Sequence, residues 1–186
     1  SLEVIKKNKN NGKKFSVGVS INNLSLNEND IGEFKTFLKV SPPLRTEDDR
    51  LALVQGIKEN LIDVIVSDHL PEDEESKRLP FAQAATGAIG IETLLPLALE
   101  MYHNESLPLE KIIETITINP SKILKINKGN LKKGSDGDIC IFDLETPWKL
   151  DAEILKSKSK NTAIESRRLQ GKVLMTFLNG ELAFNQ

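Results

Sequence analysis

The sequence predicts an α/β protein that ends in a smaller β-rich segment. Ile62–Ser67 is a short, mainly β-branched run, typical of a strand buried on both faces of a parallel sheet. A second strand-like run, Phe15–Val19, lies upstream, and a helical pattern separates the two. Strand, helix and strand in this order form a βαβ unit, which places two parallel strands in one sheet. Beyond Gly129 the pattern changes to turns and strands, which indicates a β-layer beside the α/β unit.

Two helices are expected before the second strand. Leu2 and Ile5, with charged residues between them, predict a helix that runs to Asn11-Gly12. Thr46–Asp49 resembles a capping box, in which a threonine side chain satisfies a free backbone amide of the first helical turn. The apolar residues that follow at helical spacing are Leu51, Val54 and Ile57. The pattern therefore predicts a capped helix that leads into the second strand.

Three further helices are expected after the second strand. Ile91–Met101 and Leu109–Ile116 carry apolar residues at helical spacing, and Pro108 suits the first turn of the second of these helices. Asn119-Pro120 should break the helical pattern, because a proline inside a helix removes a backbone hydrogen bond. Ser121 should then cap a short helix that follows.

The end of the chain carries the signals of a small β-layer. Asp138–Phe142 and Val173–Leu178 are predicted strands. Asn179-Gly180 follows the second of them and precedes another apolar run, which is a strong hairpin signal. We therefore divide the chain into an α/β part, residues 1–128, and a β-rich part, residues 129–186.

Composition excludes several classes of protein. The chain has 186 residues, of which 39% are hydrophobic and 28% charged, as expected for a globular domain. Its 25 basic and 27 acidic residues nearly balance, so no basic surface for nucleic acid is expected. No apolar stretch has the length of a membrane-spanning helix, and no signal peptide is evident. Cys140 is the only cysteine, which indicates a reducing compartment, and we expect the cytoplasm.

The candidate site lies where the predicted strand Ile62–Ser67 ends, at Asp68 and His69. In α/β sheets the loops at the carboxyl ends of the strands converge on one crevice, which carries the chemistry. A carboxylate held there can bind a metal and move a proton to or from a metal-bound water. An aspartate at a strand end is more often a turn former or a helix cap, and a lone histidine is more often a packed side chain than a ligand. The chain has only His69 and His103, whereas a catalytic zinc site usually takes three protein ligands.

Several segments, taken in order along the chain, match the pattern of one known family. Those around the candidate site are Lys39–Arg45, with the sequence Lys-Val-Ser-Pro-Pro-Leu-Arg, then Ile62–Pro71, Phe81 and Gly90–Leu97. Those farther downstream are Thr117–Leu124, Gly134–Asp143 and Ser157–Thr162. Together they resemble the carboxyl-terminal half of a dihydroorotase, and the resemblance extends from Ser1 to about Gly180.

Dihydroorotases belong to the amidohydrolase superfamily, so the resemblance implies the carboxyl-terminal part of a (β/α)8 barrel and strands of a small β-sandwich built from both chain ends. Phe15–Val19 would be the seventh barrel strand and Ile62–Ser67 the eighth. The family interconverts dihydroorotate and carbamoyl-aspartate in pyrimidine synthesis, usually with one or two zinc ions. Its other metal ligands, including a His-x-His pair after the first strand, would lie upstream of Ser1, so we do not expect this chain alone to bind zinc.

The resemblance also assigns roles to single positions. Asp68 matches the family's catalytic, metal-side aspartate, and His69 the residue beside it in the substrate-binding part of the site. Glu72 stands where an active enzyme typically has a second histidine that contacts the anionic substrate, which a carboxylate would repel. Ser41 stands where the family usually has a substrate-binding asparagine, and Ile21–Leu24 replaces a Pro-His-His-Leu signature. Three such changes favour a chain that has lost catalysis.

The leading hypothesis is a degenerate, non-catalytic dihydroorotase-like protein that acts as a structural partner of aspartate transcarbamoylase, as similar homologues of the family do. The first alternative is an active zinc-dependent dihydroorotase, or a related cyclic-amide hydrolase, whose other ligands lie upstream and which tolerates Glu72. A third hypothesis is a hydrolase of another cyclic amide, with Ser41 and Glu72 matched to a substrate of different charge. Because two strands cannot close a barrel, we also expect a missing amino-terminal barrel half, another partner or a second copy to cover the open edge.

Overall fold

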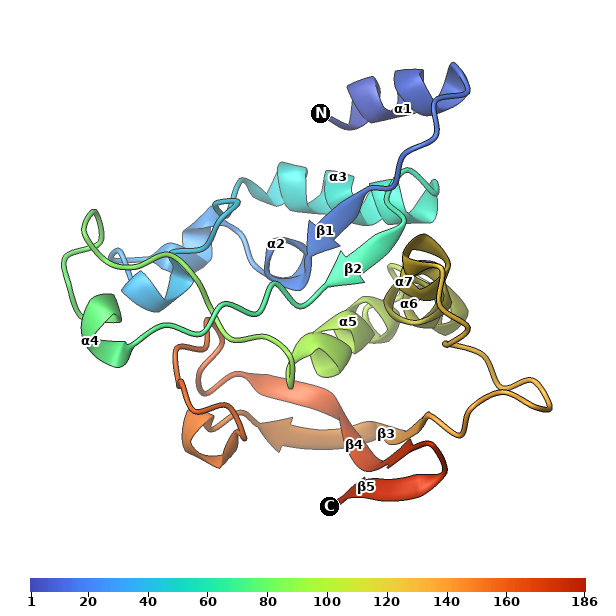
Figure 1. Ribbon diagram of the computed structural model, residues 1–186. Coiled ribbons are helices and arrows are strands. Elements are labelled where there is room, and N and C mark those ends of the chain that lie inside the picture. The colour runs from blue at the N-terminus through green and yellow to red at the C-terminus, as the bar shows by residue number, and fades with distance from the viewer.

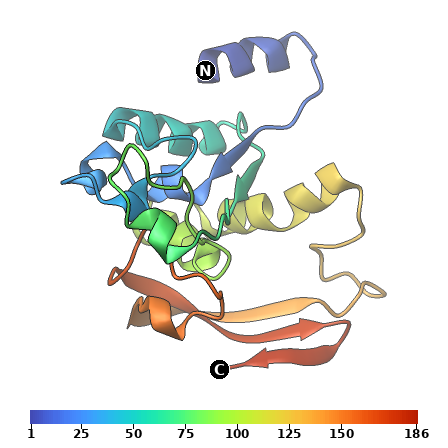
Figure 2. The same ribbon diagram turned by 60° about the vertical axis from the view of Figure 1, so that its left-hand side comes forward.

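The computed structural model describes residues 1–186, and its elements lie in successive layers (Figure 1). Helix α1 (Leu2–Asn10) stands at one end, and the long helix α3 (Glu47–Lys58) lies beside two central strands. These strands are β1 (Gly18–Ser20) and β2 (Val64–Val66). A group of helices separates them from a three-stranded sheet at the opposite end, and the two chain termini lie at these opposite ends in both views (Figure 2).

β1 and β2 are parallel neighbours that α3 connects, so the predicted βαβ unit is confirmed. Their register pairs Gly18 with Val64 and Ser20 with Val66. Both strands are shorter than the predicted runs because only three residues of each take part in the ladder. Since the strands run in the same direction, their carboxyl ends meet at one edge of the sheet.

The burial of β2 differs from the prediction. We expected a strand buried on both faces, but this holds only for Ile65, which is 3% exposed, whereas Val66 is 44% exposed. β1 is the only strand paired with β2, which leaves the other edge of β2 open, and the exposure of Val66 shows that its side chain is not covered by the rest of the chain. The central sheet therefore has an open edge and an open face.

The helix α3 begins at the predicted cap, where Thr46 Oγ1 accepts a hydrogen bond from Asp49 N at 3.2 Å. Of the predicted apolar stripe, Val54 and Ile57 are buried, and Leu51 is exposed. The cap and the stripe are thus confirmed except at the outermost leucine.

Three helices fill the space between the sheets: α5 (Leu94–His103), α6 (Leu109–Ile116) and α7 (Ile118–Leu124). α6 has the predicted bounds, but Pro108 is its cap residue and does not lie in its first turn. α5 begins later than predicted, because the residues from Ile91 to Thr93 form a turn. None of the helices combines the length and the apolar composition that a membrane crossing requires.

The prediction of a break at Asn119-Pro120 is wrong. Both residues lie in the first turn of α7, where a proline costs nothing because its missing N–H would have no partner within the helix. Ser121 therefore lies inside the helix and does not cap it, and its hydroxyl donates a hydrogen bond to Thr117 O at 3.0 Å.

The short helical elements all lie in connections between the larger ones. They are α2 (Ile21–Ser25), α4 (Glu74–Lys77) and the 3-10 turns η1 (Glu28–Ile31), η2 (Thr36–Leu38) and η3 (Ala152–Ile154). α2 and both of the first two turns follow β1, and α4 lies in the long loop that follows β2.

The carboxyl-terminal sheet consists of β3 (Ile139–Lys149), β4 (Arg168–Leu178) and β5 (Glu181–Asn185), antiparallel and in this order. The predicted hairpin is confirmed: Asn179 and Gly180 both have positive φ, as a tight two-residue turn requires. β3 extends past the predicted Asp138–Phe142. Its pairing with β4 is irregular between Asp143 and Pro147 and resumes at Pro147, and this irregularity hid the second part of the strand from the sequence pattern. The predicted β-layer is therefore present and larger than expected.

The two proposed parts share one hydrophobic core. A single cluster of 22 buried apolar residues includes Val19 and Ile65 of the central sheet together with Leu150 and Leu169 of the carboxyl-terminal part. β4 packs directly on α5, where the left-handed Gly171 lets Leu99 approach the backbone more closely than a side chain would permit. The division at residues 128 and 129 stays a prediction.

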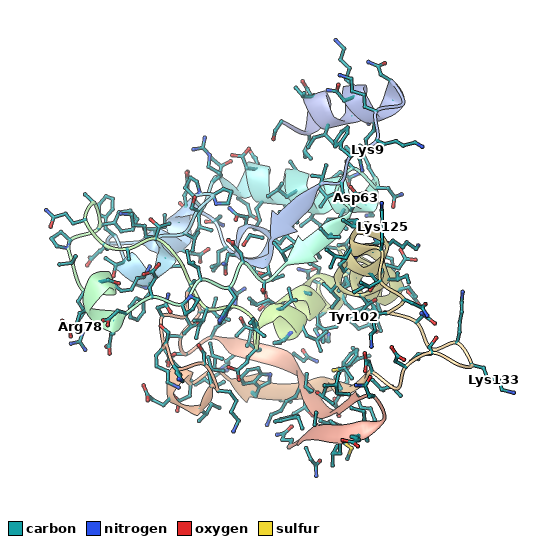
Figure 3. All side chains as sticks on the ribbon, in the orientation of Figure 1. Lys9, Asp63, Arg78, Tyr102, Lys125 and Lys133 are labelled. Atoms are coloured by element: carbon teal, nitrogen blue, oxygen red, sulfur yellow. The ribbon has the colours of Figure 1, made fainter.

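Asp63 ties α1 to the amino end of the central sheet. Lys9 Nζ lies 2.9 Å from Asp63 Oδ1, and both residues are labelled in Figure 3. The same carboxylate accepts a hydrogen bond from Val17 N at 2.8 Å, and Asn119 Nδ2 of α7 donates to Asp63 O at 2.9 Å. One residue ahead of β2 thus joins α1, the approach to β1 and α7.

Arg50 joins α3 to α2. Its guanidinium donates to Leu24 O at 2.9 Å and to Glu47 Oε2 at 2.8 Å. The hydrogen bond from Arg50, with a further one from Asn27, lowers the pKa of Glu47 to about 2. This ion pair therefore helps to hold the segment that follows β1.

The lowered pKa of Glu47 predicts an acid-sensitive contribution to stability. A carboxylate with a folded pKa below its ordinary value of 4.5 stabilises the fold fully above that value, and the contribution is lost as the pH falls toward 2. Because the side chain is 44% exposed, solvent screening limits the effect to about 0.5–1 kcal/mol. Urea unfolding of Glu47→Gln should show this loss at pH 6 and almost none near pH 2. Glu33→Gln, at an exposed residue without an ion pair, is the control, and a pH-independent difference would contradict the assignment.

Candidate functional site

The edge at which β1 and β2 end opens onto a cavity of about 930 Å³. β1 ends at Ser20, whose hydroxyl caps α2 by accepting a hydrogen bond from Asn22 N. Ser20, Asn23 and Arg45 line the cavity from the β1 side, and Val66 and Asp68 line it from the β2 side. The edge that the sequence indicated therefore does bring polar side chains from both loops together.

Asp68 makes a sharp turn directly after β2. Its φ is +51°, a left-handed conformation that aspartate tolerates better than most residues. It begins no helix, and its carboxylate accepts no hydrogen bond within the chain. Asp68 is thus a turn former in its backbone, while its side chain is half-buried at the cavity and free to act on a ligand.

His69 faces a different part of the molecule. Its Nδ1 accepts a hydrogen bond from Gly90 N at 3.1 Å, and its backbone pairs with Ala88 in an isolated bridge. It lines a separate cavity of about 670 Å³, together with Trp148 and Phe184 of the carboxyl-terminal sheet, and does not line the cavity of Asp68. This placement matches the interpretation of His69 as a packed, hydrogen-bonded side chain.

Ser41 is exposed and does not line the cavity itself, although the two residues that follow it, Pro42 and Pro43, do. Asn23 Nδ2 donates to Pro43 O at 3.1 Å, which fixes this segment beside α2. Ser41 therefore lies next to the candidate site, in the segment that leads to Arg45.

Glu72 is half-buried and does not line the cavity of Asp68. Its backbone N–H donates to Asn161 Oδ1 at 3.2 Å, and its carbonyl accepts a hydrogen bond from Ser159 Oγ. Its carboxylate raises the pKa of the nearby Lys77, against the larger effect of burial. Of the four predicted site residues, the structure places Asp68 at the cavity and Ser41 next to it, and His69 and Glu72 elsewhere.

Two glycines shape the loop that supports this edge. Gly87 has a φ of +145°, and a Cβ there would clash with Leu70. A Cβ at Gly90 would overlap the carbonyl oxygen of Ser67, so the two backbones can pack together only without a side chain. This close approach places Gly90 N against His69 and holds the residues on either side of Asp68.

Comparisons with known proteins assign the chain to a family. The model of the amidohydrolase family matches residues 8–183. The chain belongs to the amidohydrolase family. Over 184 residues it is 42% identical to a protein of Ehrlichia canis and 40% identical to one of Aquifex aeolicus, each named dihydroorotase. These matches include 99% of this chain but 41% and 43% of the relatives, so the chain spans about two fifths of their length.

Solved structures confirm the amidohydrolase fold. The L-hydantoinase (dihydropyrimidinase) of Arthrobacter aurescens superposes with a TM-score of 0.93 at 28% identity, over 99% of this chain and 42% of that enzyme. A D-hydantoinase superposes with a TM-score of 0.91 at 21% identity, over 100% of this chain and 43% of that enzyme. The predicted carboxyl-terminal part of an amidohydrolase barrel, followed by strands of a small β-layer, is thus confirmed.

Amidohydrolases generally depend on metal ions, and the residues of this chain do not fit a zinc site. No group of three or more His, Cys, Asp or Glu side chains could hold a metal ion. At the cavity Asp68 is joined by the carboxylates of Glu3 and Asp49 but by no histidine or cysteine. His103 lies at the end of α5 and lines a different cavity. Since a zinc site needs three or four protein ligands, the residues of this chain do not complete one by themselves.

Two residues around the loop were not singled out from the sequence. Lys77 and Asn161 are both buried, and both hydrogen-bond to the backbone near Asp68. Lys77 lies in a highly charged segment, residues 72–78, whose composition is typical of an exposed loop, so the sequence did not indicate that its side chain is buried. Asn161 lies in the segment Ser157–Thr162, which matched the family pattern but carried no predicted role.

The close approach at Gly90 makes a testable prediction. Gly90→Ala should push the backbone at residue 90 away from Ser67, break the hydrogen bond to His69 and destabilise the fold by about 1–3 kcal/mol, as overpacking typically does. Thermal unfolding and amide exchange at Gly90 measure both effects. Lys58→Ala is the control, because Lys58 is exposed on α3 and its side chain makes no hydrogen bond. Unchanged exchange at Gly90 in the variant would contradict the prediction.

Proposed function

We propose that this chain is a dihydroorotase-like protein of pyrimidine biosynthesis that does not catalyse ring opening with the residues it contains. The observation that carries the proposal is the set of side chains at the cavity, where Asp68 is a free carboxylate and no histidine lines the cavity. Without a bound metal to lower the pKa of water, a single carboxylate is too weak a base to activate it. The relatives named dihydroorotase support the substrate class.

The charges around the cavity support the same proposal. The side chains that line the cavity include three carboxylates, those of Glu3, Asp49 and Asp68, and one cation, the guanidinium of Arg45. Dihydroorotate carries a carboxylate, and an excess of negative charge at close range opposes the binding of an anion. The serine at position 41 and the glutamate at position 72 remain, in this proposal, degenerate substrate-binding positions.

We further propose that the chain acts as a structural partner, with aspartate transcarbamoylase as the partner that the family resemblance indicates. The open edge of the central sheet and the exposed Val66 support a role in association, because an unpaired strand presents free backbone donors and acceptors. The complementary half of a barrel or a second copy of the chain would cover the same surface. Affinity capture with purified aspartate transcarbamoylase, and light scattering of the chain alone, separate these partners.

The second candidate is an active zinc-dependent dihydroorotase or related cyclic-amide hydrolase whose other ligands come from outside these residues. The unengaged carboxylate of Asp68, placed at a cavity of about 930 Å³, favours it. In that enzyme Asp68 would be a zinc ligand and would accept a proton from the attacking water. The similarity to a hydantoinase makes hydantoins the first additional substrates to test.

We also propose the cytoplasm as the location of the protein. Its single cysteine, Cys140, is a free, exposed thiol in the structure. Exposed free thiols are typical of proteins in reducing compartments.

The proposal predicts the outcome of an activity assay. With zinc supplied, the chain should open dihydroorotate at less than about 10⁻² s⁻¹, roughly a thousandfold below the median enzyme. The assay measures carbamoyl-aspartate formed, at high protein concentration, for the chain and for Asp68→Asn, with Asp48→Asn on the exposed face of α3 as the matched control. Turnover of about 1 s⁻¹ or more that Asp68→Asn removes and Asp48→Asn retains would overturn the proposal and establish the second candidate.

A further inference from the structure

Lys77, at the end of α4, is fully buried, with 0% of its surface exposed. Lysine is among the residues that are almost never buried unless their charge is compensated. Its ammonium group donates hydrogen bonds to three backbone carbonyls, those of Lys39 at 3.3 Å, Ala85 at 3.0 Å and Gly87 at 2.9 Å. The three donors of the ammonium group are therefore all used.

Asn161, 2% exposed, completes the arrangement from the connection between β3 and β4. Its amide nitrogen donates to Leu70 O at 3.1 Å and to Gly87 O at 3.2 Å. Its amide oxygen accepts from Glu72 N at 3.2 Å and from Ser159 Oγ at 2.8 Å. The carbonyl of Gly87 thus receives hydrogen bonds from both buried side chains.

The backbone groups that these two side chains hold all lead to the candidate site. Lys39 O lies two residues before Ser41 and also accepts a hydrogen bond from Gly87 N at 2.9 Å. Leu70 follows His69, and its N–H donates to Ala88 O at 2.9 Å. Three segments that are distant in sequence therefore meet at Lys77 and Asn161: the approach to Ser41, the loop after Asp68, and the β3–β4 connection.

We propose that Lys77 and Asn161 form a positioning pair, which holds the loop bearing Asp68 and His69 in one conformation against the segment that precedes Ser41. The pair acts through the backbone, since neither side chain lines the cavity of Asp68. The inference concerns the same edge as the proposed function but holds whether or not the protein turns over dihydroorotate. Its failure and the failure of the proposed function are therefore distinguishable.

The positive charge of Lys77 contributes to the positioning pair. Burial lowers the pKa of Lys77 to about 8; the carboxylate of Glu72 raises it, and the ammonium of Lys39 lowers it further. At pH 7 the group is therefore still mainly protonated, and it can supply the three donors that the carbonyls require. An apolar replacement of the same length would leave three buried carbonyls without this donor. Opening of the loop to water would then cost less free energy, because water could donate hydrogen bonds to these carbonyls.

The experiment compares Lys77→Met with a control, Lys58→Met. Lys58 is an exposed lysine on α3 whose ammonium group makes no hydrogen bond. Amide hydrogen exchange at pH 7 is read at Leu70, Gly87 and Gly90, whose N–H groups donate to Ala88 O, Lys39 O and His69 Nδ1 respectively. Lys77→Met should accelerate exchange there by about tenfold or more and leave β3–β5 within about twofold, since local opening is independent of global unfolding. Unchanged exchange at the three amides, or an equal increase throughout the chain, would overturn the proposal.

A spectroscopic readout separates positioning from general stability. In the native chain His69 Nδ1 is an unprotonated acceptor, so nitrogen NMR should show the Nε2–H tautomer for His69. In Lys77→Met this single tautomer should be lost, while the signals of His103, on α5, stay unchanged and serve as the internal control. Lys77→Arg, which keeps a cation with several donors, should restore part of the native His69 signal.

Asn161→Leu keeps the inference falsifiable if Lys77→Met does not fold. This variant removes both hydrogen bonds to Leu70 and Gly87 and leaves the ammonium of Lys77 in place. It should change the His69 signal and the exchange at Leu70 in the same direction as Lys77→Met. A native His69 signal in Asn161→Leu would overturn the proposal. Loss of the fold in both variants would also overturn it, because the two residues would then stabilise the whole chain and would not position one loop.

Discussion

The parallel pairing of β1 with β2 is the constraint on which the rest of this structure depends. Because the two strands run in the same direction, Ser20 and Val66 end at one edge, and the loops that carry Ser41 and Asp68 leave the sheet side by side. A sheet of only two strands is marginal by itself. Its position is fixed by the shared apolar core, in which Val19 and Ile65 pack with residues from α5 and β4.

Polar groups add specific contacts at the two ends of this sheet. At the amino end Asp63 joins α1, the approach to β1 and α7. At the carboxyl end Lys77 and Asn161 hold the loop after β2, and the absence of a side chain at Gly90 lets that loop pack against Ser67. These contacts hold the loop that carries Asp68, although the chain provides no set of three zinc ligands.

The parts of the fold that could be predicted from the sequence are those set by local patterns. Strand, helix and strand before Asp68, the bounds of α6, and the Asn179-Gly180 hairpin follow from periodicity and turn residues. The place of Pro120 could not be predicted, because a proline breaks or begins a helix depending on where the first turn lies. Burial of Val66 was overestimated, because the pattern of a barrel strand does not show which neighbours the chain itself contains.

The candidate site was predictable only in part, for a related reason. The end of a buried strand identified Asp68, but the side on which His69 lies depends on the left-handed backbone of Asp68 and on the hydrogen bond from Gly90, which no local pattern reveals. The residues of this chain do not complete a zinc site around Asp68. Equilibrium dialysis of the protein against zinc, with metal analysis of the chain and of Asp68→Asn, tests this claim most directly. We expect no stoichiometric zinc at a free concentration of about 1 μM. One zinc ion per chain at that concentration, lost in Asp68→Asn, would contradict this expectation.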